Sequence, residues 1–119
     1  MDNLNPALVA DLSDRILAYC KTKPAVSFAE LSRDVEGFKG GYCWEFGRTN
    51  IIFWSGLSLE AGTAISKLFR SGRIDLDPCH PLTYLIDGHA RNLPLATEAK
   101  SYDTEHWLPV VLNLKGGAA

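Results

Sequence analysis

Apolar positions in the middle of the chain recur at the spacing of an α-helix. Between Leu57 and Leu68 they fall at i, i+4, i+7, i+8 and i+11, which places them on one face. Ser58 precedes this stripe and can accept a hydrogen bond from a first-turn N–H, and Gly72 follows it. The pattern therefore predicts a helix between Ser58 and Gly72. Its polar face carries Thr63, Ser66, Lys67 and Arg70.

A short β-hairpin is predicted directly after this helix. Ile74–Leu76 alternates apolar and polar side chains, and Thr83–Ile86 is rich in β-branched and aromatic residues. Pro78 and Pro81 lie between the two runs and cannot donate to a strand ladder, so we expect them in the turn.

Two further helices are predicted nearer the N-terminus. The first begins at Asn5-Pro6, where Asn can cap and Pro loses no hydrogen bond, and it ends near Thr22. Ser27 and Glu30 match a capping box and open the second helix, which ends at Gly37. The apolar stripes of these helices comprise Leu8, Leu12, Ile16 and Tyr19 in the first, and Leu31 and Val35 in the second.

An aromatic segment separates the second and third predicted helices. Its runs Tyr42–Phe46 and Ile51–Trp54 favour β-strands, and the four residues 47–50 between them suit a turn. We interpret the segment as a β-hairpin, and an irregular aromatic loop is the alternative.

The C-terminal part contains one more apolar run, from Trp107 to Leu114. It predicts a final strand or an extended segment packed on the domain, and Pro109 favours an edge position. We expect residues 1–114 to form a single domain and residues 115–119, KGGAA, to be a disordered tail.

The composition is that of an ordinary globular protein. The chain has 119 residues, of which 46% are hydrophobic and 22% charged, and no run is long enough to span a membrane. The N-terminus lacks the pattern of a signal peptide, so we expect a soluble, cytoplasmic protein. Its three cysteines cannot all pair within the chain and are expected to be reduced.

The segments NIIFWSGLS, LFRSGRIDL and TYLIDG together resemble the helix and wing of the winged helix-turn-helix superfamily. The resemblance covers Asn5 to Gly88, and a weaker one, carried by NIIFWSGLS and HWLPVVL, is to small bacterial or prophage-encoded proteins of uncharacterised function. The implied fold class is α+β: a winged helix with three helices, a C-terminal β-hairpin wing and an additional aromatic β-segment between helices two and three.

This resemblance implies nucleic-acid binding, with duplex DNA as the partner and transcription or phage regulation as the role. The third helix would enter the major groove, and the wing would touch the DNA backbone or the minor groove. The residues expected to bind are Thr63, Ser66, Lys67, Arg70 and Arg73 on or after the helix and His80 on the wing. The net charge of −2 provides no global basic field, so any such surface must be a local patch.

A protein-binding adaptor is the alternative function, since the same fold can present its helix and wing to another protein. Leu59 and Phe69 border the polar helix face, and Trp44 or Trp54 would provide interface anchors if exposed. The oligomeric state stays open.

Neither catalysis nor metal binding is predicted. The sequence contains no G-x-S-x-G, P-loop or H-E-x-x-H motif. A zinc site would need Cys79-His80 together with Cys20, Cys43 or His89, and these lack the short paired spacing of structural zinc ligands. We therefore expect no enzyme, no cofactor and no metal.

Overall fold

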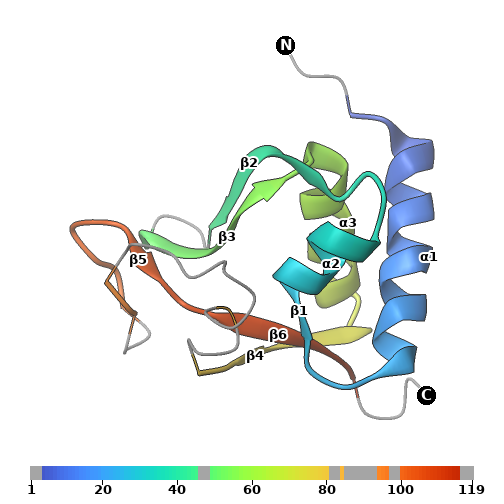
Figure 1. Cartoon of the computed structure of the whole chain (residues 1–119). Coiled ribbons are helices and arrows are strands. Elements are labelled where there is room, and N and C mark those ends of the chain that lie inside the picture. The colour runs from blue at the N-terminus through green and yellow to red at the C-terminus, as the bar shows by residue number, and fades with distance from the viewer. Residues whose placement is uncertain (1–3, 46–48, 81–83, 85–93, 97–99, 116–119) are drawn as a thin grey trace.

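The fold mixes helices and strands around a common apolar interior (Figure 1). The computed structural model describes residues 4–45, 49–80, 84, 94–96 and 100–115. Within these residues, three helices and two three-stranded sheets form an α+β arrangement. In chain order the elements are α1 Pro6–Thr22, β1 Val26–Ser27, α2 Phe28–Asp34, β2 Lys39–Glu45, β3 Ile51–Leu57, α3 Leu59–Arg70, β4 Ile74–Pro78, β5 His106–Trp107 and β6 Val110–Leu114.

All three helices begin at the capping residues that the sequence indicated. The side chain of Asn5 caps α1, and the hydroxyl of Ser58 accepts from a backbone N–H in the first turn of α3. Ser27 and Glu30 form a reciprocal capping box at the start of α2. The three predicted helices are confirmed, although α2 ends at Asp34 and not at Gly37. Each start supplies its own partner for N–H groups that the helix leaves unpaired.

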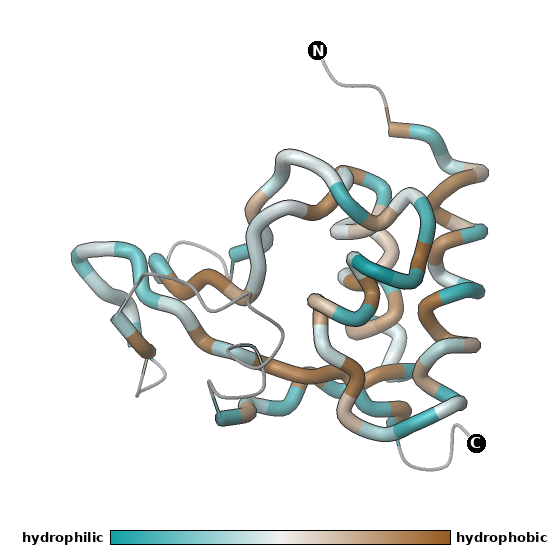
Figure 2. Tube along the Cα trace, in the orientation of Figure 1, coloured by the Kyte–Doolittle hydropathy of each residue, from teal (hydrophilic) through white to brown (hydrophobic). Residues whose placement is uncertain are grey.

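The core lies where the apolar faces of α1 and α3 meet the strands. α1 and α3 pack side by side, and Figure 2 shows β6 beneath them as a largely apolar run. The predicted stripe of α3 is confirmed, because Leu57, Ala61, Ala64, Ile65 and Leu68 are all buried. Large aromatic side chains fill the space between helices and sheets: Phe28, Phe38, Trp54, Tyr84 and Trp107.

One sheet has the strand order β1-β6-β4, with both pairs antiparallel. The prediction that Ile74–Leu76 is a strand is confirmed, since it forms most of β4. Among the described residues, the strand that pairs with β4 is β6, and most of its predicted partner, Thr83–Ile86, lies outside those residues. β6 offers three consecutive buried apolar residues, which suit a strand covered on both faces. Of Thr83–Ile86 the structure describes Tyr84, which is buried.

The central position of β6 also corrects the expectation that the last strand lies at an edge. Pro109 precedes β6 and stands outside the ladder, so its missing N–H removes no strand hydrogen bond. Its carbonyl oxygen accepts from the N–H of Cys79 at 2.9 Å. Pro109 therefore does not confine β6 to an edge, because β6 begins at Val110, one residue after the proline.

The second sheet has the order β2-β3-β5, in which β2 and β3 are antiparallel and β5 is parallel to β3. The predicted aromatic hairpin is thus confirmed over the irregular loop, although Phe46 and the first two residues of the turn, 47 and 48, lie outside the described residues. The register shifts between Lys39 and Tyr42, both of which face Leu57. Trp54 is 4% exposed and belongs to the core, whereas Tyr42 is 39% exposed.

The described chain ends against β4. The backbone N–H of Lys115 donates to the carbonyl oxygen of Arg73 at 3.1 Å, and its ammonium lies 3.3 Å from a carboxylate oxygen of Asp75. Residues 116–119 of the predicted tail lie outside the described residues. Among the helices that the structure describes, none has the length and apolar character needed to cross a membrane.

Candidate binding site between α3 and β2

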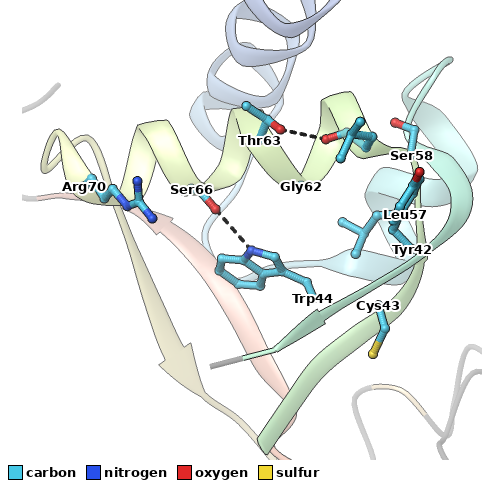
Figure 3. A pocket seen from close by; sticks show the side chains of 10 residues that line it. Tyr42, Cys43, Trp44, Leu57, Ser58, Gly62, Thr63, Ser66 and Arg70 are labelled. Atoms are coloured by element: carbon cyan, nitrogen blue, oxygen red, sulfur yellow. Dashed lines mark hydrogen bonds between the residues drawn. The ribbon is translucent and has the colours of Figure 1, made fainter. Parts of the chain in front are cut away.

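The polar side of α3 forms one wall of a pocket, and β2 forms the other (Figure 3). The pocket has a volume of about 340 Å³. Its lining consists of Tyr42, Cys43, Trp44, Leu57, Ser58, Leu59, Gly62, Thr63, Ser66 and Arg70. The aromatic hairpin therefore covers part of the polar face of α3, and the rest of that face is open to solvent.

Trp44 fastens the hairpin to α3. Its indole Nε1–H donates to the hydroxyl oxygen of Ser66 at 3.1 Å. One turn earlier, a Cβ on Gly62 would come within 3.8 Å of the indole, which is ordinary contact. On its inner side the ring packs against Phe53 and Phe28, with centroid distances of 5.0 and 6.2 Å. Trp44 thus sets the spacing between the two walls.

The end of the pocket near Ser58 is held by the junction of β3 and α3. The N–H of Ser58 donates to the carbonyl oxygen of Phe38 at 2.7 Å, and its hydroxyl donates to that of Gly37 at 2.6 Å. Gly40 approaches this junction so closely that a Cβ there would lie 2.4 Å from the Cα of Ser58. Only glycine allows this approach, so the start of β2 is fixed against the start of α3.

Positive charge gathers at the other end. Lys67, Arg70 and Arg73 are exposed and follow one another at three-residue spacing. In the part of the chain that the structure describes, none of them makes an ion pair with a carboxylate. The nearby acid Asp75 is engaged by Lys115. The cations stabilise the C-terminal end of α3 through its dipole and leave a positive patch beside the pocket.

The structure brings together three of the six residues predicted to bind nucleic acid. Thr63, Ser66 and Arg70 line the pocket, and Lys67 lies exposed on the flank of α3. Arg73 is exposed just after α3, and His80 is exposed beyond the end of β4, with neither in the pocket lining.

The sequence did not indicate Tyr42 as a site residue. The two-residue period of a strand could have placed Tyr42 on the same face as Trp44, but only the tertiary fold brings that face against α3. The position of β2 as a pocket wall depends on its contacts with α3, and the two segments are separated in sequence.

The described residues contain no group of three or more His, Cys, Asp or Glu side chains that could hold a metal ion. Cys20 is buried, Cys79 is partly buried and Cys43 is exposed, and none forms a disulfide. His89 of the imagined zinc set lies outside the described residues. The pocket itself offers hydroxyl groups, one guanidinium and aromatic surface, which suit binding of an anionic or aromatic ligand.

Comparison with known proteins adds no assignment. No family model, curated protein or solved structure matches the chain. Its function is therefore inferred from the pocket and the cations beside it.

Proposed function

We propose that this chain is a small non-enzymatic nucleic-acid-binding protein that contacts phosphate groups through Lys67, Arg70 and Arg73. The observation that carries the proposal is the run of three exposed cations without carboxylate partners among the described residues. Lysine and arginine bind nucleic acid by replacing counterions condensed on the phosphates, and an unneutralised cluster is available for that exchange. A local patch of this kind can act despite the net charge of −2.

The chain topology supports a winged-helix-like reading of this proposal. α1, α2 and α3 precede an antiparallel pair of strands, β4 and β6, which occupies the place of the β-ribbon after the third helix. In this reading β6 takes the role that the sequence suggested for Thr83–Ile86. His80 follows β4 and would lie at the base of the wing.

The hairpin limits how α3 could approach a DNA duplex. A helix with its side chains is about 10–12 Å across, nearly the ~12 Å width of the major groove. Trp44 lies against Gly62 and Ser66, so β2 runs beside α3. If the whole of α3 entered the major groove, β2 would collide with the DNA backbone on that side. Contact through the exposed C-terminal half of α3, which carries Lys67 and Arg70, fits this restriction better than insertion of the whole helix.

A salt titration with labelled nucleic acid tests the proposal. Three phosphate contacts would give a log–log slope of about −2.7 on duplex DNA, at about −0.9 per contact. The double variant Lys67→Ala/Arg70→Ala should weaken binding and bring the slope to about −0.9. Lys21→Ala, which removes an exposed cation from the last turn of α1, is the control and should leave binding unchanged. A folded double variant with native affinity would refute the proposal.

A protein-interaction role is the second candidate, and the apolar part of the pocket favours it. Tyr42, Trp44 and Leu59 offer aromatic and aliphatic surface to an occupant. Association with a protein partner need not follow the steep salt dependence of phosphate binding, so the same titration separates the two roles.

A further inference from the structure

Tyr42 differs from most large aromatic residues near it because its ring is accessible. Phe28, Phe38 and Trp54 are buried in the core, whereas Tyr42 is 39% exposed and lines the pocket. An accessible aromatic ring beside a cationic surface is the arrangement on which unpaired bases stack.

Two hydroxyl groups in the pocket keep hydrogen-bonding capacity. The oxygen of Ser66 accepts from the indole of Trp44, so its own hydrogen is left to donate. The hydroxyl of Thr63 donates to the carbonyl oxygen of Leu59 at 2.9 Å, so its lone pairs are left to accept. One donor and one acceptor, both on the outward face of α3, can pair with the polar edge of a base.

Positive charge lies at one end of the pocket. Arg70 lies at one end and Tyr42 at the other, with Trp44 between them (Figure 3). None of the described residues that line the pocket is acidic, and Lys67 adds a second cation near Arg70. A ligand with an aromatic part at Tyr42 and a phosphate at Arg70 complements this distribution.

We propose that the pocket receives an unpaired base of a single-stranded nucleic acid. Tyr42 stacks on the base, Ser66 and Thr63 bind its edge, and Arg70 binds a neighbouring phosphate. This inference depends on the proposed function and specifies its ligand. A paired base has its faces covered within the duplex, and β2 keeps α3 from full insertion into the groove, so single strands fit the pocket and duplexes do not.

The test compares three probes at one fixed salt concentration: a twelve-nucleotide oligothymidylate, the matching oligouridylate and a duplex of the same length. Single strands should bind more tightly than the duplex, and the comparison of the first two shows whether DNA or RNA is preferred. Tyr42→Ala should weaken single-strand binding roughly tenfold, within the range measured for lost stacking. Its effect on duplex binding should be absent, and Tyr42→Phe should retain the single-strand affinity.

Phe69→Ala is the matched control, because it removes an aromatic side chain of α3 that is 46% exposed and outside the pocket lining. It should not change single-strand binding. As a second readout, the indole N–H resonance of Trp44 should shift on addition of oligothymidylate. The resonances of Trp54 and Trp107, which are buried, should stay in place.

The outcomes distinguish this inference from the proposed function. Duplex binding as tight as single-strand binding, equal losses for both probes in Tyr42→Ala, or an unshifted Trp44 resonance would overturn the base pocket and leave phosphate binding intact. Failure of all three probes to bind would overturn both and leave a protein segment as the occupant to seek.

Discussion

Tyr84 and Val110 are joined in the centre of the core by a hydrogen bond of 2.6 Å, from the phenol hydroxyl to the backbone carbonyl oxygen. The same hydroxyl accepts from the backbone N–H of Phe28 at 3.1 Å. Tyr84 is fully buried, and its ring packs against those of Trp54 and Trp107. One side chain therefore connects the start of α2 to the start of β6.

Tyr84→Phe should lower the free energy of unfolding by about 1–3 kcal/mol, because it leaves a buried N–H and a buried C=O without this partner. Urea denaturation measures the change. Tyr19→Phe is the control: its hydroxyl bonds Asp34 in an exposed position, where water can replace the lost partner, and it should cost less. Equal stability of the two variants would contradict the central role of the Tyr84 hydroxyl.

Gly40 and Gly41 form a matched pair in β2. A Cβ at Gly40 would lie 2.5 Å from the carbonyl oxygen of Leu57 and 2.6 Å from the nitrogen of Ser58, whereas a Cβ at Gly41 meets nothing within 4 Å. Gly40→Ala should therefore destabilise the fold by roughly 1–3 kcal/mol or more, since backbone must move. Gly41→Ala should change stability by at most about 0.5 kcal/mol. Thermal melting of both variants tests the contrast, and a reversed order would rule out the close approach of β2 to α3.

The capping box gives the stability an acid-dependent component. Burial alone would raise the pKa of Glu30, but hydrogen bonds from the ammonium of Lys23 and the N–H of Ser27 outweigh it, and the pKa is lowered. The stabilisation is present above the unfolded pKa of about 4.3 and is lost as pH falls through the lower folded value. Because Lys23 is partly exposed, the ion pair contributes at most about 1 kcal/mol.

Urea titrations between neutral pH and pH 3 measure this component. The native protein should lose stability below about pH 4.3, and Glu30→Gln should be less stable at pH 7 with a shallower acid dependence. An identical pH profile in the variant would show that the carboxylate of Glu30 does not stabilise α2.

The helices were predictable because their signals are local. Asn5, Ser27 and Ser58 each stand next to the N–H groups that they cap, and the stripe of α3 repeats within twelve residues. The pairing of β2 with β3 was predictable for the same reason, since only a short connection separates them in sequence. The partner of β4 was not, because several runs satisfy the pattern of a strand and this pairing depends on contacts distant in sequence. β4 pairs with Val110–Leu114, which is distant from it in sequence, and no local pattern links the two runs.

The same distinction applies to the site. The polar face of α3 could be predicted from periodicity, and Thr63, Ser66 and Arg70 indeed line the pocket. The opposite wall could not, because no local pattern specifies that the hairpin folds over α3 and that Trp44 bonds Ser66.

The cysteines should differ in reactivity. Burial raises the pKa of the Cys20 thiol to about 11, so almost none of it is thiolate at pH 8. Cys43 is exposed on β2. Labelling with a disulfide reagent at pH 8 should modify Cys43 rapidly and Cys20 only in denaturant, as mass spectrometry of the peptides would show. Rapid labelling of Cys20 in the native protein would mean that this face of α1 is not packed against the core.

Two tryptophans of the hairpin, which pair across β2 and β3, should contribute differently to stability. Trp54 is 4% exposed and stacks on Phe28 at a centroid distance of 5.9 Å, so Trp54→Ala should cost about 3–5 kcal/mol. Trp44 is only partly buried, and Trp44→Phe keeps a ring while losing the hydrogen bond to Ser66, at about 0.5–1.5 kcal/mol. Urea denaturation gives both values. A larger loss for Trp44→Phe than for Trp54→Ala would mean that the attachment of the hairpin to α3, rather than the core beneath it, dominates the stability of the fold.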